Sequence, residues 1–299
     1  MLSHIVQFWI FWKKESGRKY KLLGQCKSIR NYLARLHPMK RKAVSPKKHL
    51  GQHFLNDEAI AHRIAHSVKC DDEQAFIEVG PGTGALTTHL IERFGERLLA
   101  IDVDEESILH LRNENWIPSE QVLHADILKV PLTDLTSCDE VVIVGNFPYN
   151  ISSQILFRAL DWRENCVELV GMFQKEVAER ICAAHGSKVY GILSVLMQTY
   201  YDAEYLFTVP PHVFIPPPKV QSGVIRLVKK TTQPEGVSYK HLKRVTKAAF
   251  NQRRKTLRNA LRSGGLDITQ VDEAFLSQRA EQLAPTEFAT LANSIPSSP

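Results

Sequence analysis

Apolar runs of strand length alternate with helix-like stretches over residues 74–227, and this alternation limits the fold more than any other feature. Strands are predicted at 75–79, 97–103, 121–124, 140–144 and 168–173, with helices near 85–94, 105–113, 153–160 and 175–183. Such alternation is typical of a parallel sheet covered by helices on both faces. Later strand-like runs at 201–208 and 221–228 predict an antiparallel edge.

A second region begins after a linker rich in turn residues, 231–238. Short helices are predicted beyond it, at 239–262, 268–275 and 286–292. The sequence therefore predicts an α/β catalytic domain at 47–230 and a small C-terminal helical domain at 238–296.

Positive charge is concentrated in two segments. Residues 1–48 hold 13 Lys and Arg and one acid, a net charge of +12, while the rest of the chain, with 25 basic and 31 acidic residues, carries −6. Within that remainder, 240–262 has nine basic residues and no acid, and several are spaced to share one helical face. This pattern indicates a polyanionic partner and favours an RNA-binding role for the C-terminal helices.

The first residues do not resemble the rest of the chain. Residues 1–38 are aromatic, basic and poor in acids, and Met39 stands just before the first sequence with globular patterning. Residues 1–46 are interpreted as a basic extension that is disordered or not native. A transit peptide, and an arm that binds RNA or a membrane surface, are the alternatives.

Several classes of protein are disfavoured. No apolar run approaches the roughly 20 residues of a membrane helix. The five cysteines form no C-x-x-C pair, which argues for a reducing compartment and against a zinc site or disulfides. We expect a cytoplasmic monomer with no metal and no membrane partner.

A glycine-rich turn follows the first predicted strand, with Gly80, Gly82 and Gly84 in G-x-G-x-G spacing. Glycines let the backbone approach a ligand closely, and the spacing differs from that of dinucleotide sites. Asp102 ends the next strand, where an acid accepts hydrogen bonds from ribose hydroxyls. Asp126 follows the third strand and is placed to meet an adenine amine. These features at successive strand ends predict an S-adenosylmethionine site.

Asn146-Phe147-Pro148-Tyr149 follows another apolar run. The exocyclic amine of adenine is a poor nucleophile because its lone pair is delocalised into the ring. The Asn146 side-chain carbonyl and the Pro148 backbone carbonyl can each accept one amine hydrogen, which directs the lone pair at a methyl donor. Tyr149 offers a face on which a flipped base can stack. The motif predicts methylation of the adenine N6 amine.

At these residues the chain resembles the KsgA/RsmA family of ribosomal RNA adenine dimethyltransferases, over roughly 47–292. The resemblance is carried by the segments 47–55, 78–87, 146–149, 173–180, 213–220 and 250–257. It implies that His53, Leu55 and Asn146 contact the cofactor and that Phe214 closes the other side of the target base. The chain departs from the family pattern at three positions. His53 stands where some members have Asn, Asp102 stands where many have Glu, and Phe147 stands where the family motif has Leu.

The resemblance implies a Rossmann-like S-adenosylmethionine-dependent methyltransferase with a small C-terminal helical domain. It further implies that the enzyme dimethylates the N6 amines of two adjacent adenines near the 3′ end of small-subunit (16S) ribosomal RNA. Its expected partners are that RNA and the assembling small ribosomal subunit.

Three alternatives stay open. An antibiotic-resistance methyltransferase acting on large-subunit RNA shares the glycine and Asn-x-Pro-Tyr motifs, but the triple-proline segment 216–218 and the basic helix favour the assembly-linked enzyme. A non-enzymatic assembly or transcription factor is disfavoured by the intact motifs. A DNA adenine methyltransferase usually places Asp or Asn before Pro-Pro-Tyr, which this chain lacks.

A chain that begins at Met39 is expected to fold and to transfer methyl groups at the full rate, because the preceding residues lack globular patterning. The melting temperature and the methyl-transfer rate of the shortened chain, measured beside those of the full chain, check this. A large loss in either would show that the extension contributes to the working protein.

Overall fold

The computed structural model describes residues 44–70, 73–114 and 116–297. The predictions for the basic extension, including that it is disordered or not native, fall almost wholly on residues 1–43, outside the described residues. No helix in the described part of the chain is long and apolar enough to cross a membrane.

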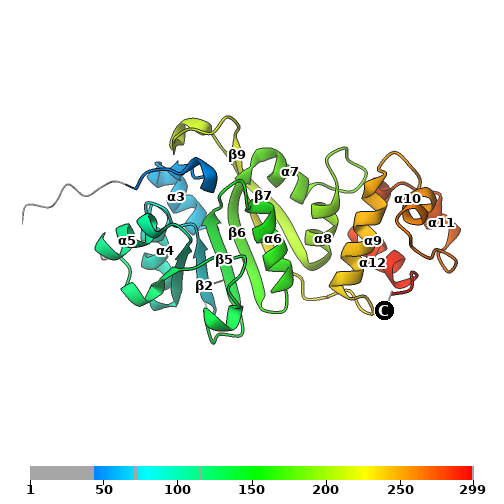
Figure 1. Cartoon of the computed structure of the whole chain (residues 1–299), viewed down its shortest axis with the longest axis horizontal. Helices are drawn as coiled ribbons and strands as arrows, with labels where there is room; N and C mark the ends of the chain where they lie inside the picture. The colour runs from blue at the N-terminus through cyan, green and yellow to red at the C-terminus, as the bar shows by residue number, and fades with distance from the viewer. Residues whose placement is uncertain (1–43, 71–72, 115, 298–299) are drawn as a thin grey trace, which may run out of the picture. The chain divides into compact units, whose positions relative to one another are not determined.

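A seven-stranded mixed sheet forms the centre of the described chain (Figure 1). In sheet order the strands are β4 (Val122–His124), β3 (Leu98–Asp102), β2 (Ala75–Val79), β5 (Val141–Asn146), β6 (Cys166–Gln174), β9 (Ser222–Lys229) and β7 (Tyr201–Val209). The first five strands run parallel, and β9 pairs antiparallel with both β6 and β7. The predicted parallel sheet with an antiparallel edge is confirmed.

Helices cover both faces of the sheet, because alternate residues of a strand point to opposite sides. Phe76 and Val142 pack in one buried cluster with α3, α4 and α5. Ile77 and Ile143 pack in the other with α6, α7 and α8. These helices are α3 (Glu58–Ala65), α4 (Thr87–Phe94), α5 (Glu105–Glu114), α6 (Ser152–Asp161), α7 (Lys175–Cys182) and α8 (Ile192–Tyr200).

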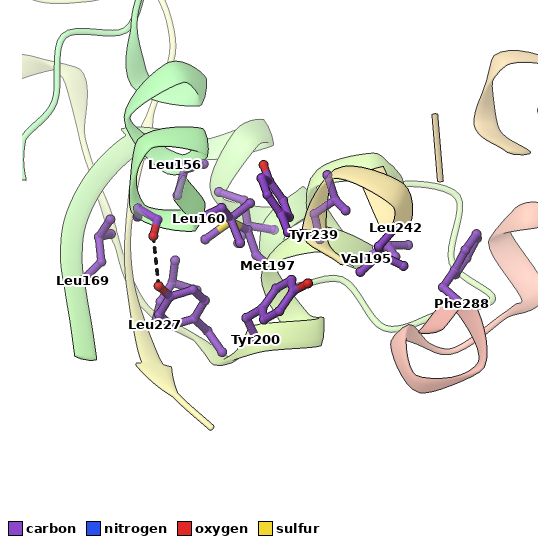
Figure 2. Packing of buried hydrophobic residues seen from close by; sticks show 14 of the residues in the cluster. Leu156, Leu160, Leu169, Val195, Met197, Tyr200, Leu227, Tyr239, Leu242 and Phe288 are labelled. Carbon is purple, nitrogen blue, oxygen red and sulfur yellow. Dashed lines mark hydrogen bonds between the residues drawn. The ribbon is translucent and has the colours of Figure 1, made fainter. Parts of the chain in front are cut away.

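The C-terminal helices share the second cluster with the sheet (Figure 2). Leu160 of α6 and Val195 of α8 belong to the same cluster as Leu242 of α9 and Phe288 of α12, and all four side chains are fully buried. The C-terminal helices are α9 (Tyr239–Asn251), α10 (Leu257–Ser263), α11 (Glu273–Leu276) and α12 (Pro285–Asn293).

The single helix predicted at 239–262 is wrong, because the structure divides it into α9 and α10. Thr256, between them, forms an isolated antiparallel bridge with Arg279. The Leu257 N–H donates to the Gln278 carbonyl at 2.7 Å. A pairing with residues distant in sequence thus ends one helix and starts the next.

The helix predicted at 268–275 is also shorter than expected. Asp267 accepts a hydrogen bond from the Thr269 N–H at 3.0 Å, a local turn that competes with helix. Asp272 caps α11 by accepting from the Ala274 N–H at 2.8 Å. The helix therefore begins only at Glu273.

A second, two-stranded ladder joins two segments that are distant in sequence. Strands β1 (Phe54–Leu55) and β8 (Phe214–Ile215) pair antiparallel, with Leu55 opposite Phe214 and Phe54 opposite Ile215. The Asn56 N–H extends the ladder by donating to the Val213 carbonyl at 2.8 Å. The opening segment is thereby held beside the triple-proline segment.

Candidate active site

The carboxyl ends of β4, β3, β2 and β5 border one cavity, the place where an open parallel sheet binds ligands. Its lining includes most of the predicted site residues, namely His53, Gly80, Gly82, Asp102, Asp126, Asn146, Pro148 and Tyr149. Residues from four strand ends and from the opening segment are thus brought together.

Leu55 and Phe214 lie outside this lining. Leu55 lines a smaller cavity that shares Gly80 and Asn146 with the first. Phe214 is 2% exposed and belongs to the buried cluster of α3 and α4. Directly opposite residues of an antiparallel pair share a face, so Leu55 and Phe214 both face the core. Phe214 is thus absent from the cavity lining in this structure, and its contact with the base stays a prediction.

The glycine turn needs glycines for two reasons. Gly80 and Gly82 have φ values of +73° and +56°, in the left-handed region that favours glycine. A Cβ on Gly82 would also lie 2.8 Å from the ring of Phe54. The backbone therefore forms a close wall of the cavity.

Glu78 is the acid of the buried strand β2, and its side chain faces the smaller cavity. Its Oε2 atom is buried and has no hydrogen-bond partner among the described residues. Burial raises the pKa of Glu78 to about 8. A buried acceptor without a donor is costly, so a ligand with an N–H group would stabilise it. The amino group of S-adenosylmethionine fits this requirement.

Asp102 ends β3, and its Oδ1 accepts a hydrogen bond from the Asp104 N–H at 2.9 Å. Burial, with a further contribution from the charge of Asp104, raises the pKa of Asp102 to about 6. Asp126 is also engaged, since it accepts from the Leu128 N–H at 3.0 Å and pairs with the exposed Lys129. Both acids are held at the cavity by local backbone contacts.

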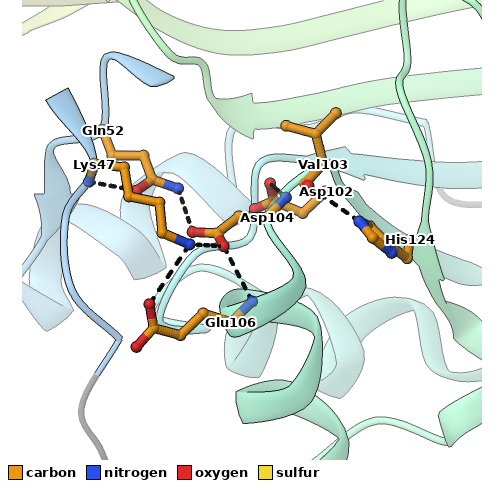
Figure 3. Close-up of polar contacts among 7 residues, drawn as sticks. All are labelled: Lys47, Gln52, Asp102, Val103, Asp104, Glu106 and His124. Carbon is orange, nitrogen blue, oxygen red and sulfur yellow. Dashed lines mark hydrogen bonds and ion pairs between the residues drawn. The ribbon is translucent and has the colours of Figure 1, made fainter. Parts of the chain in front are cut away.

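A polar network fastens the opening segment beside Asp102 (Figure 3). Lys47 Nζ contacts Asp104 and lies 3.5 Å from Glu106, and Gln52 Nε2 donates to Asp104 Oδ2 at 3.0 Å. Although burial acts in the opposite direction, these donors lower the pKa of Asp104. The ionised Asp104 thus anchors one wall of the cavity.

The Asn-x-Pro-Tyr motif is fixed by contacts to two other segments. The Asn146 side-chain N–H donates to the His53 carbonyl at 2.9 Å. The Tyr149 hydroxyl lies 2.5 Å from the Ser222 hydroxyl of β9. Burial raises the pKa of Tyr149, so the phenol is neutral at physiological pH.

Several residues that line the cavities or hold their walls are absent from the site predicted from the sequence. Glu78 could have been found as the one acid in an otherwise apolar strand, Ala75–Val79. The Asp104–Lys47 contact and the Tyr149–Ser222 contact join segments far apart in the chain, and no local pattern marks either pair. In the described ranges, no group of three or more His, Cys, Asp or Glu could hold a metal ion.

Two solved structures share this fold. One is a dimethyladenosine transferase from Plasmodium falciparum, with a TM-score of 0.67 and 23% identity over 80% of this chain and 96% of that one. The other is the 23S rRNA methyltransferase ErmE, with a TM-score of 0.63 and 21% identity over 81% of this chain and 99% of that one. These two likenesses show the fold, which is a Rossmann-like sheet covered by helices.

The comparison of sequences is more specific. The family described as ribosomal RNA adenine dimethylase matches residues 43–295, and the chain belongs to this family. A protein from Cytophaga hutchinsonii named ribosomal RNA small subunit methyltransferase A is 49% identical over 84% of this chain and 97% of its own. The protein of the same name from Bacteroides thetaiotaomicron is 47% identical over 85% of this chain and 95% of its own.

Replacing Glu78 with Gln should change how the stability of the cofactor-free protein depends on pH. A raised pKa means that the folded chain binds the proton more tightly than the unfolded chain. The stability from protonated Glu78 is therefore present at low pH and is lost as the pH rises through about 8. Gln does not titrate, so Glu78→Gln should show a smaller fall in melting temperature between about pH 5 and about pH 8.

The matched control is Glu92→Gln, which alters an exposed acid on α4. This control should keep the wild-type pH dependence. Identical curves for Glu78→Gln and the wild type would show that folding does not raise the pKa of Glu78.

Proposed function

We propose that the chain dimethylates the N6 amines of two adjacent adenines near the 3′ end of small-subunit ribosomal RNA, within the assembling subunit. S-adenosylmethionine, when bound, supplies the methyl groups. The relatives that are 45–49% identical carry the name ribosomal RNA small subunit methyltransferase A, which supports this choice of RNA. We further propose that it acts as a monomer in the cytoplasm.

The observation that carries the proposal is the hydrogen bond from Asn146 to His53. Because a backbone carbonyl only accepts, the nitrogen of the Asn146 amide must face His53. Its Oδ1 is then left as an acceptor at the cavity that Asn146 lines. This is the group needed to hold one hydrogen of an exocyclic amine.

Pro148 and Tyr149 complete the proposed site for the base. The Pro148 carbonyl accepts one hydrogen bond, from the Ile151 N–H at 3.1 Å, and a second lone pair can accept the other amine hydrogen. Tyr149 is held through its hydroxyl by Ser222, so its ring offers a fixed face for stacking. The chain needs no strong base, because the methylated amine is cationic and loses its proton readily.

We propose that exposed cations around the turn between α9 and α10 bind the RNA backbone. Lys247, Arg254, Lys255 and Arg262 are exposed and have no ion-pair partner in the described part of the chain. Two other cations are engaged within the protein. Lys243 lies over the ring of Phe157 at 4.4 Å, and Arg258 pairs with Glu273. The four exposed cations therefore lie on α9, on the turn and on α10, and not on one face of a single helix as the sequence predicted.

Asn146→Ala should lower the single-turnover rate of methyl transfer by roughly a hundredfold or more, because the amine loses a positioned acceptor. Cofactor affinity should change much less. The matched control is Asn165→Ala, which removes an amide contact of 2.7 Å to the Asp139 carbonyl just before β6. A near-normal rate in Asn146→Ala would overturn the catalytic assignment.

Replacing Arg254, Lys255 and Arg262 together with Glu should weaken binding to the RNA and leave cofactor affinity unchanged. The logarithmic slope of affinity against salt should fall by about 0.7–0.9 for each phosphate contact removed. Lys243→Met, which removes a cation engaged with Phe157, serves as the control. An unchanged salt slope in the triple variant would place the RNA-binding surface elsewhere.

A further inference from the structure

His53 contacts the catalytic motif and the triple-proline segment at the same time. Its carbonyl accepts from Asn146 Nδ2 at 2.9 Å, and its ring Nδ1 lies 2.7 Å from the Pro216 carbonyl oxygen. Its ring centroid lies 5.4 Å from that of Tyr149. We infer that His53 is a positioning residue whose ring fastens the proline segment Pro216–Pro218 to the catalytic motif. This inference rests on the proposed function.

The register of the two-stranded ladder explains why a side chain is used here. The paired residues end at Phe54 and Ile215, and the next pair in the same antiparallel register is His53 and Pro216. Pro216 has no N–H, so it cannot donate to a continued ladder. The His53 ring instead donates to the Pro216 carbonyl, which adds one contact beyond the end of the strands.

The contact also fixes where the ring carries a hydrogen. Because the carbonyl of Pro216 only accepts, Nδ1 of His53 must be the protonated nitrogen. Nδ1 is protonated in one neutral tautomer and in the imidazolium ion. Because Nδ1 carries a hydrogen in both forms, the contact with Pro216 does not depend on the charge of the ring. The other titratable groups that line the cavity beside the proline segment are Lys48, Tyr149 and Lys219.

The proline segment forms one wall of a second cavity, which shares His53 and Tyr149 with the first. Ile215, just before the segment, is 55% exposed, and Val220, two residues after it, is 42% exposed. None of the glycine turn, Asp102 or Asp126 lines this second cavity. The wall therefore lies on the Tyr149 side of the site, and its position bears on how RNA fits beside Tyr149.

Two substitutions separate the donor from the bulk of the ring. His53→Asn keeps an N–H donor at the position of Nδ1, whereas His53→Leu fills similar space without a donor. Loss of one hydrogen bond typically changes an equilibrium constant about five- to tenfold. We expect His53→Leu to raise KM for the RNA by about that factor. His53→Asn should stay close to wild type.

A second measurement reports on the segment itself. Because the segment is then less firmly held, His53→Leu should speed trypsin cleavage after the exposed Lys219 and hydrogen exchange at the Lys219 and Val220 amides. His53→Asn should not do so, and neither should His212→Leu, which alters an exposed histidine just before β8. These readouts need no methyl transfer. A wild-type chain that failed to methylate RNA would overturn the proposed function, while a loosened segment in His53→Leu would still support the role of His53.

Two results would overturn the inference. One is a His53→Leu variant whose RNA KM, proteolysis and exchange all match the wild type. The other is an equal loss of kcat in the Asn and Leu variants, with a limb of the pH–rate profile removed. That second result would make His53 a proton acceptor and not a positioning residue.

Discussion

The parallel pairing of β2 with β5 is the constraint on which the site depends. Glu78 is paired with Val144, so the glycine turn and the Asn146 motif leave the sheet side by side. Gly145 makes this closeness possible, because a Cβ there would lie 2.5 Å from the Val79 carbonyl. The proposed cofactor cavity and the proposed acceptor for the target amine therefore adjoin as a consequence of strand pairing.

Contacts from outside the five parallel strands then give the site its shape. Lys47 and Gln52 tie the opening segment to Asp104, and His53 ties it to Asn146. Phe147 is buried against a glycine of β6. A Cβ on Gly171 would lie 2.0 Å from the Phe147 ring. The ring fits there because Gly171 has no side chain.

Most of the sheet, and the gathering of residues from its strand ends at one cavity, could be predicted because short apolar runs and turn glycines are local signals. Helix α8 has no counterpart among the predicted elements, since its sequence is apolar on nearly every side and lacks helical periodicity. The division between α9 and α10 depends on Thr256 pairing with Arg279. The burial of Phe214 depends on its pairing with Leu55. Partners distant in sequence leave no such signal.

The proposed activity of this arrangement of strand ends is the dimethylation of adenines in small-subunit ribosomal RNA. Mass spectrometry can map N6-methylated adenines in ribosomal RNA from cells with and without the gene. Two adjacent dimethyladenines near the 3′ end of the small-subunit RNA should be lost without the gene and should return with the wild-type chain. Unchanged small-subunit methylation, or loss of methyl groups from large-subunit RNA alone, would rule out the proposed activity.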